Sequence, residues 1–153
     1  MIFESLLAFL HISAILMMVV FVTVEAALCR AEWLNADVVK RLVRVDVFYG
    51  VSALCVLLTG LARMYLGAKT ADWYAAQPLL HAKITLFFVI ALMSLPASLA
   101  FRRWMRQWDR TGQLPLTAEI RKVRRLIMIE SHIMLLLPLF GVMMARGVMT
   151  ISP

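Results

Sequence analysis

Several ionisable residues lie in or near strongly apolar segments of this sequence, where charge is rare. They are Glu4, His11, Glu25, Asp46, Arg63, His81, Lys83, Glu130, His132 and Arg146. Each such group costs about 2.5–3.5 kcal/mol at the centre of a membrane helix, so it needs a reason to be there. Long side chains near a segment end can reach the interface by snorkelling. That explanation suits His11, Glu130 and His132 less well, because they lie deeper in their segments.

Helical spacing places some of these residues on shared faces. Glu4 and His11 are seven residues apart and share a face, and Glu25, fourteen residues beyond His11, returns close to it. The same face carries Ala14 and Met18. We expect this polar stripe to face the interior of a helix bundle. His81 and Lys83 are two residues apart and point to nearly opposite sides. If His81 faces the bundle centre, Lys83 faces a neighbouring helix or the interface.

His11 and His81 lie on different segments at a similar depth. Two such histidines can hold a planar haem between helices, with one ligand on each face of the iron. Methionine is the other common partner of histidine, and the chain has eleven Met residues. A neutral buried histidine bonded to a carbonyl or carboxylate is the open structural alternative. Zinc is less favoured, because the sequence has no HExxH motif and no local His/Cys cluster.

Four apolar stretches must position these side chains. They run over about 5–28, 45–66, 78–101 and 126–149. Each is long enough to cross the roughly 30 Å hydrocarbon core as a helix. The chain has 153 residues, of which 63% are hydrophobic, and its mean hydropathy is +0.85. These values exclude an ordinary soluble domain. We expect one all-α, integral membrane four-helix bundle over residues 1–153, with Thr117 as the N-cap of the fourth helix.

Basic residues gather in the first and third connections, which hold twelve of the sixteen Lys and Arg residues. These are Arg30, Lys40, Arg41, Arg44, Arg102, Arg103, Arg106, Arg110, Arg121, Lys122, Arg124 and Arg125. The positive-inside rule makes that side cytoplasmic, so both termini face the outer, periplasmic side. We expect the Arg-rich face to contact anionic lipid. No motif indicates nucleic acid, and a homo-oligomer is expected because four helices shield few polar groups.

Two sequence elements resemble a known family. Leu10-His11, and Pro78-Leu79-Leu80-His81-Ala82-Lys83 with its L-H-x-K pattern, resemble the J-type (HemJ) bacterial protoporphyrinogen IX oxidases. Arg125 followed by Glu130 is faintly similar to their final helix. The ending Met144-Ala145-Arg146-Gly147 is more similar to an uncharacterised family of predicted bacterial four-helix inner-membrane proteins. That family is grouped loosely with J-type oxidases and copper-resistance D-type proteins, and we identify the chain as its member.

The resemblance implies haem b as cofactor and the bacterial inner membrane as location. Carried over by position, His11 and His81 would be haem ligands. Arg146 or Lys83 would pair with a haem propionate. Lys83 and Glu130 would be catalytic, with Glu130 in proton transfer. The substrate implied is a tetrapyrrole or a quinone.

The sequence therefore favours a haem b-binding membrane redox protein. One alternative is a small copper-handling or transport protein, because thioether sulfur suits Cu(I) and Met is abundant. Another is a structural subunit of a membrane complex. In that case the intramembrane histidines would matter only for assembly.

Overall fold

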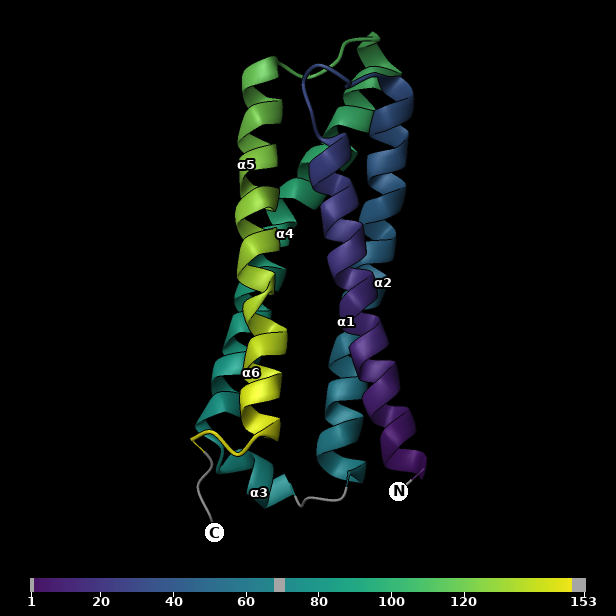
Figure 1. Ribbon diagram of the computed structural model, residues 1–153. Helices are drawn as coiled ribbons and strands as arrows, with labels where there is room; N and C mark the ends of the chain where they lie inside the picture. Colours follow the sequence, from purple (N-terminus) through teal and green to yellow (C-terminus); the bar gives the residue numbers. More distant parts are fainter. Residues whose placement is uncertain (1, 68–70, 150–153) are drawn as a thin grey trace.

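The computed structural model describes residues 2–67 and 71–149, which form helices and no strand. The helices are α1 (Ile2–Leu28), α2 (Ala36–Leu66), α3 (Ala71–Ala75), α4 (Pro78–Thr111), α5 (Thr117–Met134) and α6 (Leu136–Ala145). Figure 1 shows α1, α2 and α4 as long, roughly parallel rods, with α5 and α6 stacked end to end as the fourth. Four stretches, with α5 and α6 counted together, are long and apolar enough to cross a membrane. This confirms the all-α membrane bundle.

The helix ends follow from local sequence. Asn35 caps α2 by accepting the backbone N–H of Val38 at 2.9 Å. Pro78 opens α4, and Gly112 ends that helix in the left-handed conformation with φ 64°. The expected N-cap at Thr117 is wrong by one residue. Leu116 holds the cap position and makes no side-chain bond, so Thr117 is the first helical residue.

The fourth rod is broken at Leu135, between α5 and α6. Pro138 explains the position of the break, because a proline ring clashes with the carbonyl four residues earlier. That residue is Met134, the last of α5. Pro96 lies inside α4 without ending it.

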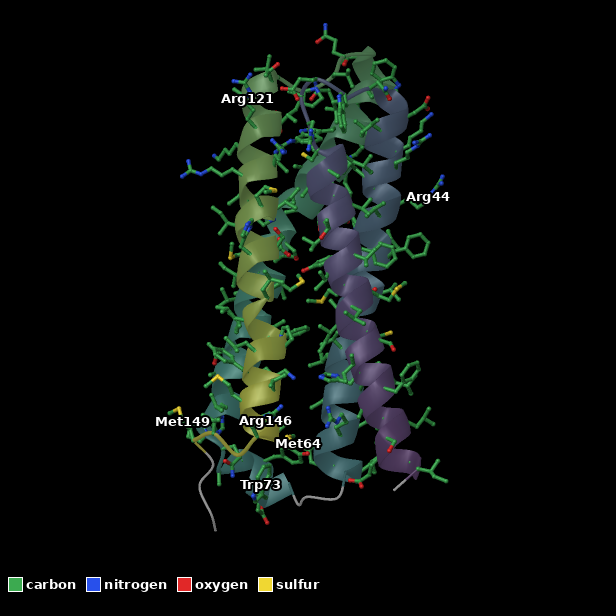
Figure 2. The ribbon with its side chains drawn as sticks, viewed as in Figure 1. Arg44, Met64, Trp73, Arg121, Arg146 and Met149 are labelled. Carbon is green, nitrogen blue, oxygen red and sulfur yellow. The ribbon has the colours of Figure 1, made fainter. Side chains whose placement is uncertain are left out.

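The rods form a square. α1 packs against α2 and α5, and α4 packs against α2, α5 and α6. Over the described residues, α1 and α4 make no close backbone approach, so they lie on a diagonal. The connections that carry the basic residues meet at one end of the bundle, where Arg44 and Arg121 lie (Figures 1 and 2). α1 begins and α6 ends at the opposite end, near Met64 and Trp73.

Packing is tightest in the half of the bundle nearest the basic connections. Its largest buried side chains include Trp104, Phe101 and Leu42. There the Trp104 indole N–H donates to Glu119 at 2.8 Å, and Arg103 pairs with the same carboxylate, which ties α4 to α5. Toward the other end fewer side chains are buried. In α6, as the structure describes it, Leu137 is the one buried residue.

Candidate functional site

His11 is the first buried residue of α1, and its ring is fixed on both sides. Its Nδ1 lies 2.9 Å from Thr59 Oγ1 on α2. The Thr59 hydroxyl donates to the Cys55 carbonyl at 2.6 Å, so its oxygen is left to accept the Nδ1–H of His11. Nε2 therefore carries the lone pair of a neutral ring. Hydrogen bonds to the second ring nitrogen fix metal-binding histidines in the same way.

Lys83 reaches this lone pair from α4. Its Nζ lies 3.4 Å from His11 Nε2, so the amine donates and the ring accepts. Gly60 makes room for the ring, because a Cβ there would lie 3.3 Å from His11 Cε1, a tight contact. A Cβ at Gly141 would lie 3.7 Å from Lys83 Nζ, at ordinary contact distance. Arg63 adds a further positive charge nearby.

The remaining predicted site residues near this end do not join His11. His81 is exposed, and its Nε2–H donates to the Ala75 carbonyl at 2.7 Å. It faces away because Lys83, two residues later, faces the interior. Arg146 is exposed at the end of α6 (Figure 2). His132, also exposed, bonds the Met128 carbonyl one turn earlier at 2.6 Å.

A second polar group lies in the half of the bundle nearest the basic connections. Glu130 on α5 is buried and accepts the Tyr49 hydroxyl of α2 at 2.6 Å. Ser98 on α4 donates to Asp46, and Arg102 lies 3.8 Å from the other Asp46 oxygen. Glu25 on α1 is buried as well. The polar stripe predicted on α1 is confirmed from His11 onward, because His11, Ala14, Met18 and Glu25 are all buried, whereas Glu4 is only half-buried.

A cavity of about 460 Å³ lies between α2 and α4 beside this group. Met18, Phe87 and Ile90 give it apolar walls. Its polar lining comes from Asp46, Tyr49, Ser94, Ser98 and Arg102. The exposed side chains of Val47, Val51, Leu54 and Leu95 also line it, so the cavity opens on the lipid-facing surface.

Sequence reasoning missed Tyr49, Ser98 and Thr59. A signal for the first was available, because Asp46, Tyr49, Ser52 and Val56 recur at helical spacing and are all buried along α2. The sequence carries no such signal for Thr59 and Ser98, because a hydroxyl in a membrane helix usually bonds to the backbone of its own helix. Their roles depend on which helix lies opposite.

The arrangement of these side chains limits which metal or haem sites the chain can form. No group of three or more His, Cys, Asp or Glu side chains suited to a metal ion occurs in the described part of the chain. His11 lies inside the bundle and His81 faces outward, so within one chain the two histidines do not fit the two faces of one haem.

Comparison with known proteins assigns the chain to a family. A family model described as "Predicted membrane protein (DUF2214)" matches residues 3–149. The chain belongs to this family. No curated protein and no solved structure matches it significantly. The predicted membership of an uncharacterised membrane family is thus confirmed, whereas the likeness to J-type oxidases and copper-resistance D-type proteins is not shown by these comparisons.

Proposed function

We propose that this membrane protein binds a lipid-soluble molecule of the quinone class in the cavity between α2 and α4. The observation that carries the proposal is the cavity itself, which opens on the lipid-facing surface and has polar groups in its lining. Its volume of about 460 Å³ is in the range of small-molecule sites. Such a ligand would enter from the bilayer without crossing water.

The lining matches the chemistry of a quinone ring. Met18, Phe87 and Ile90 would contact the apolar ring and tail. Ser94, Ser98 and Arg102 lie on one face of α4. The hydroxyls of Ser94 and Ser98 already donate to the Ala91 carbonyl and to Asp46, so the N–H groups of Arg102 are the donors suited to a quinone carbonyl oxygen. Tyr49 reaches both the cavity and the Glu130 carboxylate, so it is placed to pass a proton between them.

Gly50 allows a direct test. It lines the cavity, and a Cβ there meets nothing within 4 Å, so Gly50→Leu should fill the space without disturbing the fold. Cys55→Leu adds a similar side chain on the exposed face of the same helix and serves as the matched control. Ser98→Ala removes one polar contact.

The protein in lipid nanodiscs would be photolabelled with an azido-ubiquinone in competition with decyl-ubiquinone. We expect label on α2 and α4 peptides, with affinity lowered at least about tenfold in Gly50→Leu and unchanged in Cys55→Leu. Label spread over all helices, or equal affinity in Gly50→Leu and wild type, would remove the proposal.

Haem b is the second candidate. The Thr59 contact that fixes His11 Nδ1 favours it, and a haem iron would take the place of Lys83 Nζ, which donates to His11 Nε2 at 3.4 Å. His81 would not supply the opposite ligand in the same chain, so that ligand would come from elsewhere, such as a second copy in a homo-oligomer. A Soret band in the purified protein, altered by His11→Ala and unaffected by His81→Ala, would support this arrangement; a protein with no Soret band after haem addition would rule it out.

We also propose a bacterial inner-membrane location with the basic end in the cytoplasm. The basic side chains of the two connections at one end support this orientation. That end would rest against anionic lipid.

A further inference from the structure

Glu25 is a buried carboxyl group with one oxygen left unsatisfied. Only 4% of the residue is exposed, and in the described part of the chain Oε1 has no hydrogen-bond partner. A carboxylate left unpaired in an apolar bundle loses its solvation without compensation. The neutral acid form avoids most of that cost.

Among the residues that the structure describes, the helices packed against α1 supply no positive partner for this carboxyl group. α1 packs against α2 and α5. α2 contributes Asp46 and Tyr49, and α5 contributes Glu130; the charges of Asp46 and Glu130 both act on Glu25. Among the described residues the ion-paired carboxylates are Asp46 and Glu119. Arg124 of α5 lies close by, but its Nε donates to the Ala26 carbonyl.

Glu130, one of these neighbours, is linked to the cavity through Tyr49. The Tyr49 hydroxyl donates to Glu130 at 2.6 Å, and Tyr49 lines the cavity between α2 and α4. Three acidic side chains and a phenol from three helices thus lie close enough for their charges to act on one another. Asp46 differs from the other two acids because Ser98 donates to it and Arg102 lies beside it, and both contacts stabilise the ionised form.

We propose that Glu25 is a proton-binding site: it holds a proton in the resting protein and exchanges it with Glu130. When Glu25 releases its proton and Glu130 takes it up, the group keeps the same total charge. Tyr49 then connects the Glu25–Glu130 pair to the cavity. That last link rests on the proposed quinone site, whereas proton binding at Glu25 does not.

The test is carbodiimide labelling of the full chain in lipid nanodiscs. Dicyclohexylcarbodiimide reacts with protonated carboxylic acids in apolar surroundings. The acid proton moves to a carbodiimide nitrogen and the carboxyl oxygen bonds to the central carbon. Migration of the acyl group to nitrogen then leaves a stable N-acylurea. Mass spectrometry of peptides identifies the labelled residue.

We expect label on Glu25, none in Glu25→Gln, and none on the ion-paired Asp46, which is the internal control. Addition of Na⁺ should leave the rate unchanged. Protection by Na⁺, or an unlabelled Glu25 while the reagent modifies other carboxyl groups, would overturn the proposal. The photolabelling experiment needs no carbodiimide, so the two proposals fail independently.

Infrared spectroscopy keeps the proposal testable if Glu25→Gln does not fold. The wild-type protein should show the carbonyl stretching band of a protonated carboxylic acid, shifted in D₂O. Asp46→Asn should retain the band, since Asp46 is the ionised member of the group. A wild-type spectrum without this band at neutral pH would overturn the proposal.

Discussion

Nζ of Lys83 on α4 lies 3.4 Å from Nε2 of His11 on α1, across the diagonal of the bundle. These two helices make no close backbone approach in the described structure, so the bond is a side-chain link between rods whose backbones stay apart. It sits at the end where few side chains are buried. The His11–Lys83 pair therefore helps to hold α1 and α4 together at this end of the bundle, whatever ligand the site binds.

The tight fit of His11 against α2 predicts different outcomes at two glycines. Replacing a helical Gly by Ala usually gains up to about 1 kcal/mol. Gly50→Ala should show this gain, because its Cβ meets nothing within 4 Å. Gly60→Ala places its Cβ 3.3 Å from His11 Cε1, so the gain should be lost or reversed. Thermal unfolding in nanodiscs checks this, and equal gains in both variants would contradict it.

Tyr49→Phe should destabilise the protein by about 1–2 kcal/mol. The variant keeps the ring but removes the hydroxyl that donates to Glu130, which leaves a buried carboxyl group without that donor. Tyr65→Phe is the matched control, since Tyr65 is 67% exposed. Reversible unfolding in mixed micelles measures both variants. If the two substitutions have equal effects, the Tyr49–Glu130 bond contributes nothing to stability.

Cys29 should resist thiol reagents in the folded protein. It lies between α1 and α2, where burial raises its pKa from 9.0 to about 12. The thiol is also positioned to donate to the Ile120 carbonyl at 3.9 Å. In a Cys55→Ala background, maleimide at pH 8 should label Cys29 only after unfolding in detergent. Rapid labelling of the folded protein would show that the thiol is accessible.

The same pKa shift gives stability a defined pH dependence. A raised pKa means that the folded protein holds the thiol proton more tightly than the unfolded chain does. This contribution is complete below pH 9 and is lost as the pH rises toward 12. Comparison with Cys29→Ala isolates it: the stability difference between wild type and variant should shrink over that interval.

The two basic connections should face the same side of the membrane. Single cysteines at Asn35 and Gln113, in a Cys55→Ala background, should react from the cytoplasmic side in oriented vesicles. A cysteine at Asp72, in α3 at the opposite end, should react from the other side. Asn35 and Gln113 are both exposed, so their reactivity reports topology. Reaction of all three from the same side would contradict the four-span arrangement.

The four spans could be predicted because an apolar run of membrane length has one stable form, the helix. Their ends could not, because α2 starts at Ala36 and α4 continues to Thr111 through charged turns that hydropathy does not mark. Pro96 and Pro138 illustrate the same limit. Only the second coincides with a helix break, and neighbouring helices decide whether a proline is accommodated.

The inward face of α1 could be predicted from the spacing of His11 and Glu25 along a single helix. The choice between His81 and Lys83 could not, since it depends on how α4 is rotated against its neighbours. The structure places Lys83 inside and His81 outside. Tyr49 as the partner of Glu130 required knowledge of which helices lie side by side.

The order of synthesis gives the buried Glu25 one more consequence. α1 and α2 form a hairpin closed by the short connection over residues 29–35, and this hairpin emerges from the ribosome well before α5. Glu25 therefore reaches the lipid ahead of Glu130, its neighbour on α5. A neutral acid passes the insertion machinery far more readily than a carboxylate, so the proton on Glu25 also eases the biogenesis of the protein.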